Sequence, residues 1–325
     1  MTFTTITTVS TKSRPRRFSL SLVSAKPSPL LNLPAELVID ILELVFAQTK
    51  PSVLSTISKA ISLLVDIVLY RTVVLHSKES LVLFHRTTLS RSPAFFDSHV
   101  KKLVVSYKPQ NVVTYERAQR AISVCTGVRS LVLSMWFGAA CLTSIMGQRA
   151  DGGVSEITLQ STDGIQTGPH SSKPSSDLQL ADSASDCISH LRIAEPGEGW
   201  TSPEEILRPF GALRNLTHLQ LSRRVNSNVE NDIKFENQVR SILRTRPTKL
   251  STVAVVIFPQ SWAQDDDVEE SDIWDTMNRV AELDQRLVLA QGKVEDWGKQ
   301  WRHADSVTGR GFWKEIRGDV PKRKI

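Results

Sequence analysis

Residue types that carry enzyme and metal chemistry are present in this chain, but their spacing builds none of the common reactive sites. The seven histidines are scattered, and Cys125, Cys141 and Cys187 form no C-x-x-C pair. The chain also lacks the phosphate-binding glycine loops, the G-x-S-x-G serine motif and the H-E-x-x-H zinc motif. We therefore expect no catalytic residue, no cofactor and no metal site, and we predict that the protein is not an enzyme.

One set of polar side chains recurs at a constant position. His190 and His218 each precede the central leucine of an apolar triplet, and Arg192 and Gln220 each follow it. Because side chains alternate along a strand, these four residues should point away from an apolar core. We predict that they form a candidate substrate-binding face. A solvated surface position without a ligand is the alternative interpretation.

The triplet itself recurs along most of the chain. It consists of an apolar residue, two residues of any kind, and two further apolar residues separated by one position. Its central residues are Val73, Leu103, Leu131, Ile157, Leu191, Leu219 and Val253, with a weaker copy at Leu287. Their spacing of 26 to 34 residues leaves room for a strand and one helix in each copy.

Helical signals lie between several triplets. Ser202-Pro203-Glu204-Glu205 is a capping box, and apolar residues recur at helical spacing after Tyr115, Phe235 and Ile273. Alternating strands and helices predict a parallel sheet with helices outside it, over residues 70–291. A Ser-, Asp-, Gly- and Pro-rich stretch predicts an exposed loop insertion at 161–187.

An amphipathic helical module is predicted ahead of these triplets, at residues 30–69. Pro34 suits the first turn of a helix, and apolar side chains then recur on one face from Leu37 to Val45. A second helical pattern runs from Ser52 to Leu69.

This module resembles the F-box, which docks substrate adaptors onto the Skp-type subunit of cullin ubiquitin ligases. The resemblance is carried by Leu33-Pro34-Ala35-Glu36-Leu37, Ile41-Leu42, Ile57-Ser58-Lys59 and Leu69-Tyr70-Arg71. It implies a Skp-type adaptor of a cullin ubiquitin ligase as partner. The contact residues that it implies are Leu33, Pro34, Leu37, Ile41 and Val45.

The remainder looks like an irregular leucine-rich-repeat solenoid, of the kind often attached to an F-box in fungal proteins. The expected fold class is therefore α/β, with a helical F-box-like module followed by an irregular solenoid of alternating strands and helices. The asparagine ladder of regular repeats cannot form, because its position holds other residues, such as Lys108 and Phe258. A compact α/β sheet is the alternative fold.

The net charge of +6 belongs to the two ends of the chain. Eight of the 40 lysines and arginines lie in the first 35 or the last four residues, which leaves 32 basic and 34 acidic residues between them. We therefore expect no nucleic-acid partner. The apolar runs are also too short for a membrane span. Residues 1–29 are predicted to be a disordered basic Ser/Thr-rich tail, and a mitochondrial presequence is a second interpretation of them.

Residues 292–325 form the last predicted region, a Trp-rich cap followed by a basic tail. Trp297, Trp301 and Trp313 are expected to cover the open apolar end of the last repeat.

Three functional hypotheses follow. The first is a substrate-recognition adaptor of a Skp–cullin–F-box ubiquitin ligase, cytoplasmic or nuclear, whose repeat region binds a protein substrate. The second is a repeat scaffold with a degenerate F-box and no ligase role. The third is an enzyme that uses a cleft formed by the insertion loop, which predicts perturbed ionisable groups clustered in a pocket.

Overall fold

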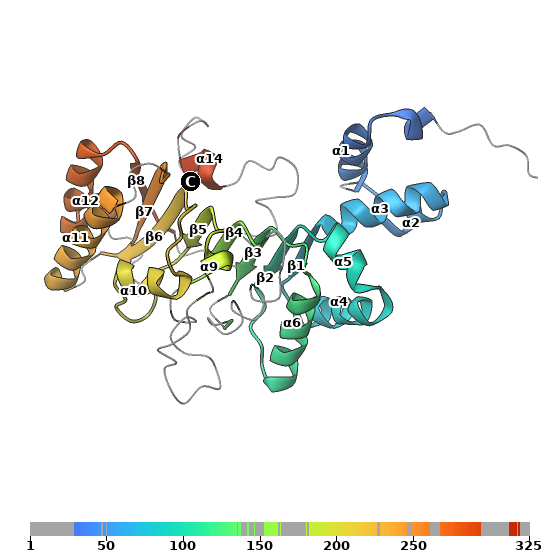
Figure 1. The fold of residues 1–325 in the computed structure, drawn as a ribbon, viewed down its shortest axis with the longest axis horizontal. Helices are drawn as coiled ribbons and strands as arrows, with labels where there is room; N and C mark the ends of the chain where they lie inside the picture. The colour runs from blue at the N-terminus through green and yellow to red at the C-terminus, as the bar shows by residue number, and fades with distance from the viewer. Residues whose placement is uncertain are drawn as a thin grey trace, which may run out of the picture.

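The computed structural model describes most of the chain between residues 29 and 318. The described residues are 29–46, 48–49, 51–134, 136–137, 142, 146, 153–161, 163, 180, 182–225, 228–245, 249–260, 267–293, 312–316 and 318. Figure 1 shows a long sheet with a group of helices beyond its first strand. Residues 1–28 of the predicted tail, Cys141, Trp297 and Trp301 lie outside the described residues.

The sheet is parallel, and its eight strands follow one another in chain order. The strands are β1 (Thr72–Leu75), β2 (Lys102–Val105), β3 (Ser130–Leu133), β4 (Glu156–Leu159), β5 (His190–Ile193), β6 (His218–Arg224), β7 (Thr252–Phe258) and β8 (Leu287–Gln291). The chain is thus an α/β protein with one parallel sheet.

The central residues of the apolar triplets stand in one straight row across the sheet. Each pairs in register with the next, from Val73 opposite Leu103 to Val253 opposite Leu287. All eight are buried, and they belong to one continuous core. The predicted triplet therefore sets both the register of the strands and the face that they bury.

Helices cover the core side of this sheet. They include α4 (Lys78–Ser90), α5 (Pro93–His99), α6 (Val112–Val124), α9 (Asp182–Ser185), α10 (Pro203–Leu207), α11 (Val229–Thr245) and α12 (Asp272–Leu283). The predicted capping box of Ser202 forms at the start of α10, where Glu205 Oε2 accepts from the Ser202 amide at 2.9 Å. Among the described residues, no helix is both long and apolar enough to cross a bilayer.

The N-terminal helices are α1 (Ala35–Phe46), α2 (Pro51–Ser55) and α3 (Lys59–Arg71), after a short 3-10 turn at Pro29–Asn32. The single helical pattern predicted from Ser52 to Leu69 is broken in two. Ser58 adopts an extended conformation, and its hydroxyl accepts from the Ile61 amide at 3.2 Å, which starts α3 afresh. The helix α3 then leads directly into β1.

Two intervals between strands contain helices that the sequence patterns did not predict. The interval between β1 and β2 holds two helices, α4 and α5, rather than one, because Ser92-Pro93 begins a second helix. Most of the loop insertion predicted at 161–187 lies outside the described residues. Near its predicted end, α9 occupies Asp182–Ser185 and buries Ala184 and Ser185.

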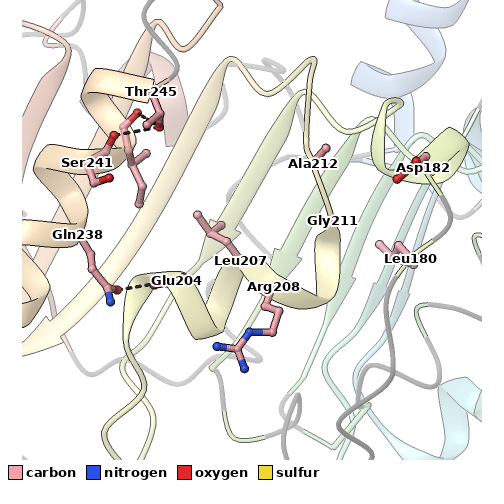
Figure 2. Close-up of a pocket in the computed structure, with 11 residues that line it drawn as sticks. Leu180, Asp182, Glu204, Leu207, Arg208, Gly211, Ala212, Gln238, Ser241 and Thr245 are labelled. Atoms are coloured by element: carbon pink, nitrogen blue, oxygen red, sulfur yellow. Dashed lines mark hydrogen bonds between the residues drawn. The ribbon is translucent and has the colours of Figure 1, made fainter.

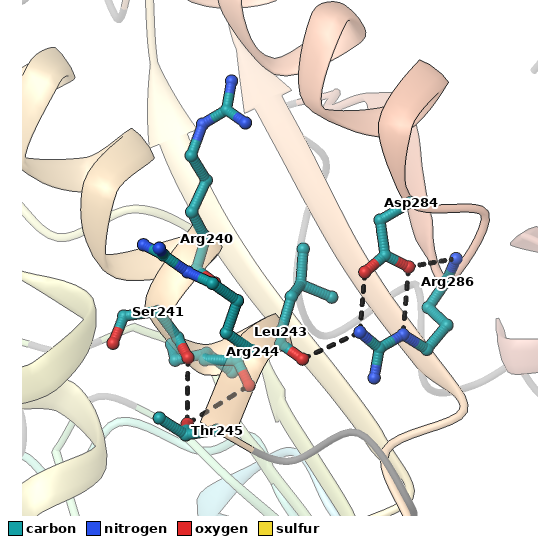
Figure 3. Close-up of polar contacts among 8 residues, drawn as sticks. Arg240, Ser241, Leu243, Arg244, Thr245, Asp284 and Arg286 are labelled. Atoms are coloured by element: carbon teal, nitrogen blue, oxygen red, sulfur yellow. Dashed lines mark hydrogen bonds and ion pairs between the residues drawn. The ribbon is translucent and has the colours of Figure 1, made fainter.

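The C-terminal ends of α11 and α12 are tied together by one arginine (Figure 3). Arg286 lies in the turn before β8, and its guanidinium donates to the Leu243 carbonyl in the last turn of α11 at 2.7 Å. The same guanidinium pairs with Asp284 at 2.6 Å and lowers the pKa of that carboxyl below its ordinary value. A cation in the turn after α12 thus satisfies a carbonyl in the last turn of α11.

The turn before β3 provides a test of this packing. A Cβ on Gly127 would lie 1.7 Å from the backbone oxygen of Asp97 in α5, whereas a Cβ on Gly199 would meet nothing within 4 Å. We expect Gly127→Ala to lower the free energy of unfolding by about 1–3 kcal/mol, because α5 must move away from the turn. Urea denaturation measures this, with Gly199→Ala as the matched control. Equal stability of the two variants would contradict the close packing.

Candidate functional site

The outer side of α1 is an exposed apolar surface. Val38 and Leu42 are buried where α1 packs on α3. A second apolar row, turned away from them, remains accessible. Its members and their exposed fractions are Leu33 40%, Leu37 49%, Ile41 37% and Leu44 61%, and we call these four residues the α1 face.

This surface contains most of the residues that the F-box resemblance implies. Leu33, Leu37 and Ile41 belong to the α1 face, Pro34 is exposed just before α1, and Val45 is half-buried. Leu44 was not among the predicted contacts, although its position seven residues after Leu37 places it on the same side of the helix.

Exposed apolar side chains are concentrated in this part of the molecule. Among the described residues, nine of the sixteen large apolar side chains that are exposed lie between Leu33 and Leu69. Such a concentration favours this part of the molecule as a contact surface, because isolated exposed hydrophobes would be spread more evenly.

The second surface lies on the side of the sheet opposite the core, and we call it the sheet face. It consists of His190, Arg192, His218 and Gln220, the four residues of the predicted substrate face. His190 pairs in register with His218, and Arg192 with Gln220. The two imidazole rings stack with centroids 4.3 Å apart and planes 9° apart, and Arg192 Nε donates to Gln220 Oε1 at 2.6 Å.

The sequence predicted that the sheet face would be open to solvent, but in the structure it is covered. Arg192 and Gln220 are buried, and the histidines are half-buried. The helix α14 (Phe312–Ile316) lies over them, with the Phe312 ring 3.9 Å from Arg192 Cζ. In Figure 1 α14 lies beside β5 and β6, across the sheet from α10.

Trp313 therefore does not lie where the sequence predicted it. Instead of covering the end of the last repeat, its ring lies 5.8 Å from the His190 ring and 5.1 Å from the His218 ring. The sequence offered one signal for this contact, the adjacent aromatic pair Phe312-Trp313 in a C-terminal region that is otherwise rich in basic residues and glycine.

A separate cavity of about 560 Å³ lies at the carboxyl ends of β5 and β6. It holds Glu195, whose pKa is raised by burial and partly restored by a hydrogen bond from Gln160 and by Arg224 and Arg192. Arg223 also lines it, but its guanidinium pairs with Asp232 at 2.7 Å and lies 4.3 Å over the Trp200 ring. The cavity thus holds one carboxyl with a raised pKa beside charges that are paired within the protein.

A smaller hollow of about 420 Å³ lies between α10 and α11 (Figure 2). Gln238 spans its edge, and its side-chain oxygen accepts from the Glu204 amide at 2.9 Å. This bond satisfies a backbone donor in the first turn of α10, so Gln238 has a structural role there. Within the described part of the chain, no three His, Cys, Asp or Glu residues gather as a metal-binding group.

Comparison with known proteins does not supply a function. No protein-family model matches the chain, and no curated protein sequence matches it. The α1 face and the sheet face are therefore assigned from their own chemistry.

The sheet face should respond to pH through His190. Burial lowers the pKa of His190 below its ordinary value of 6.5, while Glu156 on β4 opposes the shift. His218 and Arg192 are its other polar neighbours on the face, and a proton on His190 adds positive charge beside them. The folded state therefore takes up this proton less readily than the unfolded chain, and stability is lost as pH falls through 6.5 and below.

We expect the free energy of unfolding to decrease between pH 7.5 and 5.5, and to decrease less in His190→Gln. Urea denaturation at both pH values measures the difference. His76→Gln, at an exposed position, is the matched control. A wild-type slope in His190→Gln would show that this histidine does not titrate differently in the folded protein.

Proposed function

We propose that the protein is an F-box-like substrate-recognition adaptor of a Skp–cullin–F-box ubiquitin ligase. In this role the chain positions two other proteins and carries out no chemistry itself. The proposal joins a helical docking module, residues 30–69, to an irregular leucine-rich-repeat-like solenoid that binds a protein substrate. Its place of action would be the cytoplasm or the nucleus.

The observation that carries this proposal is the double apolar character of α1. One row of its side chains, with Val38 and Leu42, stabilises the module by packing on α3. The residues of the other row, the α1 face, each keep between 37% and 61% of their surface exposed to solvent. Exposing such a row is unfavourable unless a partner buries it, at roughly 25 cal/mol for each Å².

The charges beside the α1 face indicate what the partner should offer. Glu36 and Asp40 are exposed, and each directly precedes an apolar member of the face, Leu37 or Ile41. A row of carboxylates therefore runs along one edge of the apolar row. The matching surface is an apolar groove with basic side chains on that edge, because charge complementarity fixes the orientation of docking.

The repeat half of the proposal is supported by the order and registration of the strands. Eight parallel strands in chain order make an extended sheet, in which each copy contacts its neighbours. The face opposite the core carries the polar group of β5 and β6. A solenoid of this kind offers a protein partner a broad surface. A compact α/β sheet would offer a smaller accessible surface.

The alternative function is a scaffold in which the module only caps the sheet. Two contacts favour it: α3 continues directly into β1, and Asp66 of α3 pairs with Arg91 at 3.1 Å. Both contacts involve α3, and neither uses the α1 face. A cap therefore needs α3 but gives no reason for the exposed row on α1.

The direct test is co-purification of the full chain with a Skp-type adaptor. We expect wild type to bind, and Leu37→Asp to weaken binding by at least about 30-fold, because a carboxylate would be buried in an apolar interface. Leu283→Asp is the matched control, since it places the same charge at an exposed leucine on α12. Circular dichroism checks that both variants fold.

Absence of adaptor binding by the folded wild-type chain would contradict the ligase role and favour the capping scaffold. Equal loss of binding in Leu37→Asp and Leu283→Asp would show that the α1 face is not the contact.

A further inference from the structure

The contact between α14 and the sheet face is made by two adjacent aromatic side chains. Phe312 lies against Arg192, and Trp313 lies against His190 and His218. The two aromatic rings pack edge to face with centroids 5.1 Å apart. Phe312 thus contacts Arg192, which follows the central leucine of β5. Trp313 contacts His190, which precedes that leucine, and His218, which pairs with His190 from β6.

The sheet face is organised by its own strands. Ser189 Oγ lies 2.8 Å from His190 Nδ1, and Thr217 Oγ1 lies 2.8 Å from His218 Nδ1. Gln220 holds Arg192 and also donates to the Ala194 carbonyl at 3.3 Å. The imidazole pair and the guanidinium are therefore set in place by neighbours within the sheet, and they form a prepared receptor for aromatic rings.

The helix α14 has the properties of an exchangeable occupant. It has five residues, which is too short for a helix to be stable in water without docking. Phe312 and Trp313 are half-buried and lie outside the main core, which is on the other side of the sheet. The chain leaves β8 at Gln291, and α14 nevertheless packs on β5 and β6. Loss of this contact would leave the core row intact.

We propose that the sheet face recognises a short helical protein segment with two adjacent aromatic side chains, and that α14 occupies this site as an internal competitor. A protein partner of this chemistry must displace α14 in order to bind. The inference rests on the proposed function only in taking the sheet face as the substrate-binding surface. It adds the class of ligand and the segment that regulates access.

A fluorescein-labelled peptide with the sequence of residues 306–320 tests this proposal by fluorescence anisotropy. The proteins are the full wild-type chain and a full chain with Phe312→Ala and Trp313→Ala, which we call the opened chain. We expect the peptide to bind the opened chain at least about tenfold more tightly than wild type, because the site is vacant there. A peptide with both aromatic residues replaced by alanine should not bind.

The receptor is tested by Arg192→Ala in the opened chain, which should weaken peptide binding by about tenfold. Arg244→Ala is the matched control, because Arg244 is exposed on α11, on the other side of the sheet. Equal peptide binding by wild type and the opened chain would overturn the proposal. So would a folded opened chain that does not bind, or binding that is unaffected by Arg192→Ala.

A second measurement applies if the opened chain does not fold. Trypsin cleavage after Lys314 in the full chain requires α14 to leave the sheet and unwind. We expect Arg192→Ala to raise the rate of this cleavage by about fivefold. Saturating unlabelled peptide, with Arg310, Lys314 and Arg317 replaced by glutamine so that trypsin does not cut it, should have the same effect on wild type. Unchanged rates in both cases would overturn the proposal.

These outcomes are separate from those of the adaptor test. Leu37→Asp should leave peptide binding by the opened chain unchanged, because the α1 face and the sheet face share no residue. If adaptor binding fails while the peptide still competes with α14, only the ligase role is contradicted. If the adaptor binds but the peptide does not compete with α14, only the proposal of an internal competitor is contradicted.

Discussion

The row of apolar side chains that crosses all eight strands is the contact on which the other parts of the molecule depend. A parallel strand of four residues buries too little surface to be stable alone, and each strand from β2 to β7 is held by neighbours on both sides. Since the row of central residues sets the register, it also decides which flanking residues lie opposite each other on neighbouring strands. His190 reaches His218, and Arg192 reaches Gln220, because Leu191 and Leu219 are paired.

This constraint explains which parts of the structure could be predicted from the sequence. The triplet is a local pattern that repeats, so the strands, their register and the buried face follow from it. The break at Ser58 depends on one side-chain hydrogen bond, and an unbroken helical pattern conceals it. The position of α14 depends on two aromatic contacts with strands far back in the chain, which local spacing does not encode. The four residues of the sheet face were therefore predicted together, but their cover was not.

The two candidate surfaces have different physical characters. The α1 face is an apolar row bordered by carboxylates, and it lies beyond the first strand of the sheet. The sheet face is a cationic and aromatic group on β5 and β6, and the chain itself covers it. An open surface suits a constant partner, whereas a covered one suits a partner that must compete for access. This division of roles matches an adaptor that stays attached to its ligase and exchanges its substrates.

The most direct test of the adaptor account is hydrogen–deuterium exchange of the full chain with and without a Skp-type adaptor. The account predicts slower exchange in α1, where the partner would cover the helix, and unchanged exchange in β5 and β6. Protection confined to the sheet, or no protection anywhere at adaptor concentrations that saturate known F-box proteins, would contradict it.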